Sequence, residues 1–265
     1  MLQVRVKILY NKKIKGNYFH LLFRAPKIAK EPTPGQFLMV KVNDAYEPLL
    51  RRPLSIHRLK GTNIELLYEV VGRATEVLSH RKPGEYLDVI GPLGNGFDYR
   101  TSYSVHRTSI LIAGGMGVAP LVFLAEKLKR RSTKDEVRKT IVLIGARTKN
   151  EILCEREFQE LGCEMKISTD DGSRGFKGKV TGLLRKILPL AISNKPLAIY
   201  ACGPRPMLRE ISRISKEYNI AAQVSLEEHM ACGFGACLGC AVNTKDGFKR
   251  VCKEGPVFDA DEIIW

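Results

Sequence analysis

The sequence has no uncharged segment long enough to cross a membrane. The best candidate, residues 110–125, is shorter than the roughly 20 residues that a spanning helix needs, and three glycines and Pro120 interrupt it. The sequence also lacks a secretory signal, because residues 1–7 alternate in the manner of a strand where a signal peptide would be continuously apolar. These absences predict a soluble protein that does not associate with a membrane.

Disulfide bonds are not expected either. The chain carries seven cysteines without a secretory signal, which indicates a reducing compartment, and we expect the cytoplasm. Four of the seven crowd together near the C-terminus. Metal coordination is a better use for such a group than disulfide formation.

Acidic residues are in the minority, with 28 Asp and Glu against 43 Lys and Arg and a formal net charge of +15. Such a balance can indicate nucleic acid, an acidic partner or a solvated surface. The basic residues are spread along the whole chain, and no basic stretch is interleaved with aromatics as in single-strand binders. We therefore expect a solvated surface with some docking of an acidic partner, and no binding of nucleic acid.

Residues 1–102 are predicted to form a small antiparallel β-barrel. Short apolar runs, separated at short spacing by Gly and Pro, are typical of such barrels. The expected strands include residues 2–10, 19–23, 36–42 and 64–71.

Residues 103–222 are predicted to form an α/β domain with a parallel sheet, because strands alternate with helices there. Strands are expected at 110–113, 141–144, 165–167 and 197–200, and helices at 121–129, at 151–161 and from about residue 207. Residues 223–265 are rich in Cys and Gly and too few to form a core alone, so a metal centre is expected to stabilise them. The expected fold class is a multidomain α+β protein.

The cysteine spacing is the most specific motif. Four residues separate Cys232 from Cys237, two separate Cys237 from Cys240, and eleven separate Cys240 from Cys252. This is the plant-type [2Fe–2S] spacing, and thiolates are the soft, charged ligands that iron–sulfur clusters need. The alternative is a structural zinc site with four cysteine ligands, although such ligands usually come as two short pairs.

A second motif is Arg52-Pro53-Leu54-Ser55, late in the predicted barrel. An Arg can hold a pyrophosphate through two hydrogen bonds, and a Ser hydroxyl can reach a ring nitrogen. The alternative is an ordinary strand with a surface Arg.

Two further motifs each lie between a strand and a helix of the α/β region. In the first, Gly114, Gly115 and Gly117 would let a diphosphate approach a helix N-terminus, or would only make a tight turn. The second, Cys202-Gly203, follows a parallel strand at the end where such sheets bind ligands, although a buried Cys is usually inert.

These motifs, in this order, resemble the ferredoxin–NADP reductase superfamily. More narrowly, the chain looks like the electron-transfer subunits of class B dihydroorotate dehydrogenase, over essentially its full length. Further segments that carry the resemblance are GPLGNGF at 91–97, TDDG at 169–172 and GPVFD at 255–259. The cysteine block with the GPVF ending is its most specific part.

The resemblance implies a role for each motif. The barrel would bind FAD, with Arg52, Pro53, Leu54 and Ser55 at the flavin and its diphosphate. The family's other FAD segments match Leu67, Tyr68, Glu69, Ala74 and Thr75, although the family commonly has Arg at position 69 and Gly at 74. The α/β domain would bind NAD(H), with the glycine loop at the diphosphate and Cys202 and Gly203 near the nicotinamide.

The resemblance also implies a direction of electron flow in pyrimidine biosynthesis. Electrons would pass from the FMN of a separate dihydroorotate dehydrogenase catalytic subunit, through the [2Fe–2S] cluster and FAD of this chain, to NAD⁺. The two subunits would form a heterotetramer of two plus two. Hydride transfer to the flavin needs no general acid or base, so no catalytic residue is expected, and His57 is read as a surface or packing residue.

The sequence leaves two alternative functions open. The first is the reductase subunit of a related FAD and [2Fe–2S] oxidoreductase, such as a ferredoxin-linked transhydrogenase, a sulfhydrogenase or a sulfite reductase, because one fold can serve them all. The second is a basic, zinc-stabilised protein that binds nucleic acid.

Overall fold

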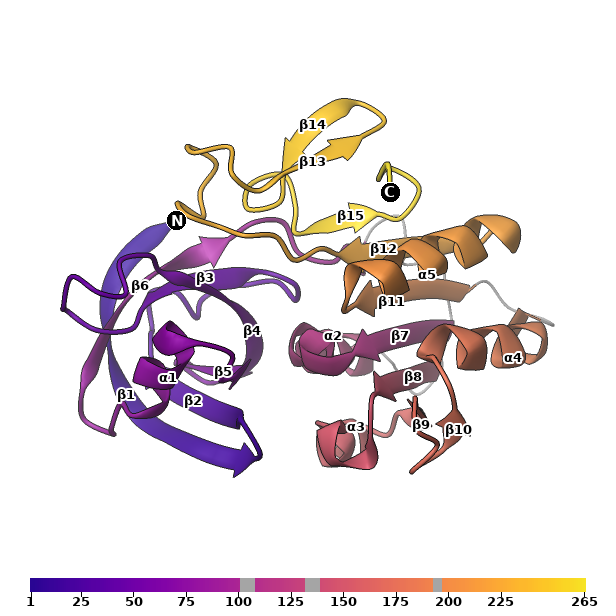
Figure 1. Cartoon of the computed structure of the whole chain (residues 1–265), viewed down its shortest axis with the longest axis horizontal. Coiled ribbons are helices and arrows are strands. Elements are labelled where there is room, and N and C mark those ends of the chain that lie inside the picture. Colours follow the sequence, from indigo (N-terminus) through magenta and orange to yellow (C-terminus); the bar gives the residue numbers. More distant parts are fainter. Residues whose placement is uncertain (101–107, 132–138, 193–196) are drawn as a thin grey trace.

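The computed structural model describes residues 1–100, 108–131, 139–192 and 197–265. The described chain forms a closed barrel, a sheet covered by helices, and a small C-terminal segment that lies along both (Figure 1). None of the helices in these ranges is long and apolar enough to cross a membrane. The predicted boundary at 102/103 lies outside the described residues.

The barrel is closed by six strands in the order β1-β2-β5-β4-β3-β6. Every neighbouring pair that the strand register gives is antiparallel, as the Gly- and Pro-punctuated runs predict. The strands are β1 Leu2–Lys15, β2 Tyr18–Arg24, β3 Phe37–Lys41, β4 Arg52–Lys60, β5 Asn63–Glu69 and β6 Tyr86–Leu93, with the short helix α1 Arg73–Ser79 between the last two.

The second large part of the molecule is a seven-stranded sheet with the strand order β10-β9-β8-β7-β11-β12-β15. All of its strands are parallel except β15, which runs antiparallel to β12. The strands are β7 Thr108–Gly114, β8 Lys139–Ala146, β9 Glu164–Thr169, β10 Phe176–Lys177, β11 Leu197–Cys202, β12 Ala221–Ser225 and β15 Val257–Asp259. The helices are α2 Val118–Lys129, α3 Glu155–Glu160, α4 Val180–Ile192 and α5 Arg205–Glu217.

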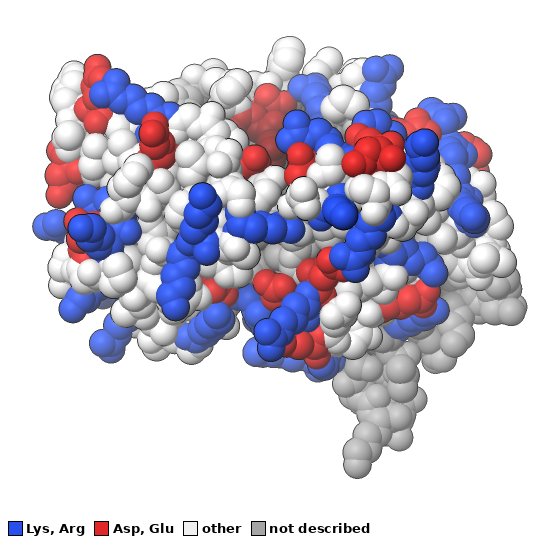
Figure 2. All heavy atoms as spheres, turned by 60° about the horizontal axis from the view of Figure 1, so that its bottom comes forward, with Lys and Arg blue, Asp and Glu red and all other residues white. Residues whose placement is uncertain are grey.

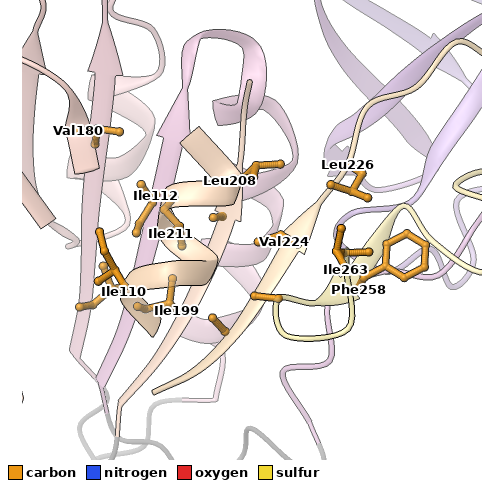
Figure 3. Packing of buried hydrophobic residues seen from close by; sticks show 14 of the residues in the cluster. Ile110, Ile112, Val180, Ile199, Leu208, Ile211, Val224, Leu226, Phe258 and Ile263 are labelled. Atoms are coloured by element: carbon orange, nitrogen blue, oxygen red, sulfur yellow. The ribbon is translucent and has the colours of Figure 1, made fainter. Parts of the chain in front are cut away.

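The C-terminal segment does not stand apart from this sheet. It contributes β15, and β12 runs across the predicted 222/223 boundary. Its own two-stranded sheet pairs β13 Ala241–Thr244 with β14 Gly247–Arg250. In Figure 3, Phe258 and Ile263 of this segment lie beside Leu226. All three belong to the apolar cluster that also contains buried residues of the sheet and of α5.

Helix periodicity explains how the helices cover the sheet. In α5 the buried residues Leu208, Ile211 and Ile214 recur every three positions, and Figure 3 shows Leu208 and Ile211 facing the strand residues Ile112 and Ile199. Such a stripe buries one face of a helix and leaves the other in water.

α2 differs from α5 because its own apolar residues lie on more than one side of the helix. Nine of its twelve residues are buried, as expected for a helix that has neighbours on opposite sides. One side lies on the sheet, and Phe123 on the other belongs to the apolar core of the barrel. α2 therefore joins the two large parts of the molecule.

Polar contacts fix this interface as well. Arg58 of β4 pairs with Glu126 of α2 at 2.7 Å, and the Lys15 ammonium donates to the Ile152 carbonyl. The imidazole Nδ1 of His57 lies 2.9 Å from the carbonyl oxygen of Ala119. His57 is fully buried, and this desolvation lowers its pKa to about 4.

The predicted helix over residues 151–161 is wrong at its start. A short 3-10 turn covers Lys149–Glu151, residues 152–154 are not helical, and α3 begins only at Glu155. Cys154 at the N-cap has φ of 60°, in the left-handed region, where the helix cannot continue.

The surface carries both signs of charge. On the face drawn in Figure 2, blue basic side chains alternate with red acidic ones over most elements, without a continuous basic field. Many charged side chains of the described residues form ion pairs, for example Arg185 with Glu217 at 2.9 Å and Lys179 with Asp170 at 2.7 Å. This mixed face is what a solvated surface predicts.

Candidate functional site

A cavity of about 770 Å³ opens between the barrel and the parallel sheet. It lies at the carboxyl ends of parallel strands, where open α/β sheets bind ligands. Thirteen of the fourteen residues expected at the nucleotide cofactors line it: Arg52, Pro53, Leu54, Ser55, Leu67, Tyr68, Glu69, Thr75, Gly114, Gly115, Gly117, Cys202 and Gly203. The fourteenth, Ala74, is buried in the apolar core of the barrel beside the cavity.

The barrel wall of the cavity is formed by β4 and β5, which pair with each other. At the start of β4, Arg52 donates to the Leu50 carbonyl at 2.9 Å. No carboxylate among the described residues lies within ion-pair distance of the Arg52 guanidinium. Its charge is therefore available for an anionic group in the cavity.

Glu69 places a negative charge on the same wall. Its carboxylate accepts from the Tyr18 hydroxyl, and burial together with this carboxylate raises the pKa of Tyr18. Arg73 does not offset the charge of Glu69, because it pairs with the exposed Glu47 at 3.0 Å. Arg52 is thus the basic residue of this wall that has no acidic partner.

The wall of the cavity on the side of the parallel sheet, called the sheet wall here, begins at the C-terminal end of β7. Gly117 is the N-cap of α2, and a Cβ atom there would lie 1.9 Å from the carbonyl oxygen of Cys202. Only glycine lets the start of α2 approach the end of β11 so closely. Gly115 differs, since it has φ of 53° and nothing within 4 Å of an added Cβ, so the loop leaves open space there.

Cys202 has features both of a residue of the site and of an inert buried cysteine. It lines the cavity, yet its side chain is buried in the sheet core, and this burial raises the pKa of its thiol. The thiol is therefore protonated at neutral pH. It therefore presents the cavity with an uncharged, apolar surface.

The segment after β12 also lines the cavity, with Leu226, Glu227, Glu228, His229 and Met230. None of these five residues was predicted at the site from the sequence. Desolvation of the Glu227 carboxyl group raises its pKa, although the residue as a whole is exposed. The position of this segment after a parallel strand was the signal that could have identified it.

The four C-terminal cysteines lie in two pairs. The thiols of Cys232 and Cys237 contact each other, as do those of Cys240 and Cys252. Within the ranges that the structure describes, no three of these sulfur atoms lie within 4.8 Å of one another. A single zinc ion would hold four sulfurs about 3.8 Å apart, whereas a two-iron cluster takes two thiolates on each iron. The arrangement therefore fits a [2Fe–2S] cluster.

The backbone around Cys232 favours a negatively charged sulfur, whereas burial and the neighbouring Cys240 raise the pKa of Cys252. Burial alone would raise the pKa of Cys232, but backbone amides near residues 234–237 lower it to about 6. The Ala236 amide lies 3.3 Å from the Cys232 sulfur, and the Cys252 amide 3.4 Å from that of Cys240. Left-handed glycines at 233 and 235 give the loop its shape.

The cysteine loop lies against the barrel beside the cavity. A Cβ at Gly233 would overlap the Met39 side chain of β3 at 2.3 Å, so the loop rests directly on that strand. Phe37, two residues earlier on the same side of β3, lines the cavity. The cysteine loop and the cavity are thus separated along β3 by only about 7 Å.

Comparison with known families agrees with both sites. The model described as the iron–sulfur cluster binding domain of dihydroorotate dehydrogenase B matches residues 227–264. The model described as the oxidoreductase NAD-binding domain matches residues 111–213. The fold and these two matches define an oxidoreductase subunit of the ferredoxin reductase type with an iron–sulfur module.

Individual relatives are more specific. The chain is 42% identical to the dihydroorotate dehydrogenase B (NAD(+)) electron transfer subunit of Desulforamulus reducens, over 98% of this chain and 97% of the relative. It is 40% identical to the subunit of the same name from a Geobacillus species, over 100% and 99% of the two chains. The chain belongs to the family of dihydroorotate dehydrogenase B (NAD(+)) electron transfer subunits.

Solved structures place the fold in the same group. A chain from an NADH-dependent reduced ferredoxin–NADP oxidoreductase, described in work on flavin-based electron bifurcation, superposes with a TM-score of 0.82 at 30% identity, over 98% of this chain and 90% of that chain. A ferredoxin NADP⁺ reductase from Neisseria gonorrhoeae with bound FAD and NADP superposes at 0.69 and 15% identity, over 81% and 91%. The predicted fold class, family, electron-transfer function and cofactor set are confirmed.

Proposed function

We propose that this chain carries electrons from the FMN of a catalytic dihydroorotate dehydrogenase subunit to NAD⁺. It does so in the cytoplasm, as part of a heterotetramer of two plus two. The observation that carries the proposal is the closeness of two different redox sites. The cavity that suits nucleotides and the loop that suits a cluster lie on neighbouring positions of β3.

The residues of the barrel wall suit the flavin part of FAD. Leu54 and Leu67 offer apolar surface, Ser55 offers a hydroxyl, and the Arg52 guanidinium offers charge to a diphosphate. Glu69, held by Tyr18, suits a hydroxyl-bearing part of the cofactor better than a phosphate, because like charges repel.

The residues of the sheet wall suit NAD(H). The loop from Gly114 to Gly117 presents backbone and open space at the start of α2, where a diphosphate is favoured. The neutral thiol of Cys202 and the backbone of Gly203 give a close, uncharged wall for the nicotinamide.

The thiolates of Cys232, Cys237, Cys240 and Cys252 would hold the [2Fe–2S] cluster. When bound, the flavin supplies the conversion between the two-electron chemistry of nicotinamide and the one-electron chemistry of the cluster. The chain's own part is to position these groups and exclude water. Met39 and Phe37 serve this purpose, because both are buried where the cysteine loop meets the cavity.

We further propose that the catalytic subunit docks on the cysteine loop. Cys237 is exposed there, and its neighbours Phe234 and Leu238 are 44% and 63% exposed. Apolar side chains that a monomer leaves in water beside a redox centre suit a protein interface. Docking at this loop would also bring the partner's cofactor close to the cluster.

The test is a comparison of the purified chain with and without its partner. We expect the isolated chain to oxidise NADH with an artificial dye and to show no oxidation of dihydroorotate. Together with an equal amount of the FMN subunit, it should reduce NAD⁺ with dihydroorotate. Dihydroorotate oxidation by the isolated chain would contradict the assignment, and so would co-purification with a ferredoxin-linked enzyme in place of the FMN subunit.

A further inference from the structure

A second group of potential metal ligands lies at the interface between the barrel and the sheet. It comprises His20 on β2, His57 on β4 and Glu157 on α3. One ligand atom of each residue lies within 4.8 Å of the other two. Among the described residues this is the one group of three or more His, Cys, Asp or Glu side chains with that property.

Both histidines leave one ring nitrogen without a partner. In His57, Nδ1 contacts the Ala119 carbonyl oxygen at 2.9 Å, and in His20, Nδ1 lies 3.5 Å from the Glu65 carboxylate. The Nε2 atom of each ring is buried and has no hydrogen-bond partner among the described residues. His57 is 0% exposed, so its Nε2 cannot reach bulk water either. Buried polar atoms without partners are uncommon and costly, and two of them side by side call for an explanation.

We propose that His20, His57 and Glu157 form a binding site for a divalent transition metal ion of the zinc type. Two imidazole nitrogens and a carboxylate oxygen are ligands that zinc accepts. Histidine ligands of metals usually direct their second nitrogen to a carbonyl or carboxylate, as Ala119 and Glu65 receive the Nδ1 atoms here. The free Nε2 atoms are then the electron-pair donors.

The distances and charges support such an ion. Tetrahedral ligands at zinc lie about 3.4 Å apart, so the three atoms must each close by no more than about 1.4 Å. Among the described residues Glu157 has no ion pair, whereas its neighbours Arg58 and Glu65 are already paired with Glu126 and Lys60. The carboxylate of Glu157 is therefore the one free to bind a cation.

The site would connect two parts of the molecule. His20 and His57 belong to the barrel, and Glu157 belongs to the helix that follows β8 in the nucleotide-binding part. The His20 side chain is 20% exposed, which gives an ion a way in from solvent. A bound ion would hold the two walls of the cavity at a fixed separation.

The experiment uses the full-length protein with its flavin and iron–sulfur cluster in place, so that iron occupies the cysteines. After treatment with a mild chelator, zinc chloride is titrated by calorimetry into the wild type and into Glu157→Gln and His20→Gln. Glu160→Gln, on the exposed part of the same helix, is the matched control. We expect one zinc equivalent to bind, at least a tenfold weaker affinity in the first two variants, and no change in the control.

X-ray absorption at the zinc edge adds a readout that does not depend on folding of the variants. We expect only nitrogen and oxygen ligands in the wild type. The absence of saturable binding, equal affinity in all four proteins, or sulfur ligands at the zinc would each overturn the proposal. None of these results bears on electron transfer, so the two proposals fail independently.

Discussion

The close approach of Gly117 to Cys202 makes a quantitative prediction for Gly117→Ala. The added Cβ would lie 1.9 Å from the Cys202 carbonyl oxygen and 2.3 Å from its carbonyl carbon. Both atoms belong to the backbone, so no side chain can turn aside. Because real Cβ contacts essentially never fall below 3.0 Å, the glycine loop and the end of β11 must separate by at least about 1.1 Å.

This displacement moves the two loops that we propose to face the nicotinamide. Overpacking of this kind costs about 1–3 kcal/mol of stability, and a misplacement of about 1 Å costs on the order of 100-fold in rate. We therefore expect kcat/KM for NADH in the dye-reductase assay to fall by about 100-fold. The flavin and iron contents should stay at the wild-type level, because neither Arg52 nor the four C-terminal cysteines take part in this contact.

Gly72→Ala is the matched control. Gly72 has an extended backbone with φ of 176° and nothing within 4 Å of an added Cβ. Its substitution should change stability by less than about 0.5 kcal/mol and leave the kinetics of NADH unchanged. If Gly117→Ala oxidised NADH within twofold of the wild type, the view that this packing positions the nucleotide loop would be refuted.

Three other variants test separate parts of the account. Cys252→Ser should remove the cluster's iron and its visible absorbance while the flavin stays, whereas Cys163→Ser, outside the cysteine loop, should retain both; iron analysis decides. Glu227→Gln tests the raised pKa of the Glu227 carboxyl group. The stability that this group contributes is present below its ordinary pKa of 4.5 and is lost as the pH rises through the higher pKa of the folded state, so the variant should gain thermal stability relative to the wild type between pH 4.5 and 7. A difference in thermal stability that stays constant over this pH range would refute the prediction. Phe234→Asp should weaken binding of the catalytic subunit at least tenfold without changing NADH–dye activity, as measured by surface plasmon resonance with Lys216→Asp as a remote control; equal weakening in both variants would refute a docking face at the cysteine loop.

Local patterns predicted most of the elements. The strands at 110–113, 141–144, 165–167 and 197–200 all lie inside observed strands, because short apolar runs between turns are a strong signal for a parallel sheet. The same signal failed before α3, where the apolar residues Ile152 and Leu153 are buried without being helical. Periodicity cannot distinguish a buried extended segment from the first turn of a helix.

Contacts between distant segments could not be predicted in this way. Strand β15 joins the sheet beside β12, some thirty residues earlier, and no local pattern of a three-residue strand announces that pairing. His57 was read as a surface or packing residue, and it packs fully buried against Ala119 because α2 meets the barrel there. The cysteine spacing was informative for the opposite reason, since the chemistry of the cluster fixes the separation of its ligands along the chain.

The assignments of individual cofactor contacts and of the two domain boundaries stay predictions. The cavity brings the expected residues of β4, β5, β7 and β11 to one place, which the order of motifs along the chain could suggest but not demonstrate. Glu69 is the least expected member of this set, because a carboxylate on the wall of a cavity that suits a diphosphate would repel a phosphate.

The most direct test of the account is an anaerobic titration of the purified chain with NADH, followed by visible absorbance and electron paramagnetic resonance. If the cavity and the cysteine loop form one electron path along β3, NADH should bleach the flavin absorbance and produce the signal of a reduced [2Fe–2S] cluster in the same protein. A flavin that is reduced while the cluster stays oxidised, or a colourless protein that contains zinc in place of iron at the four cysteines, would contradict the account.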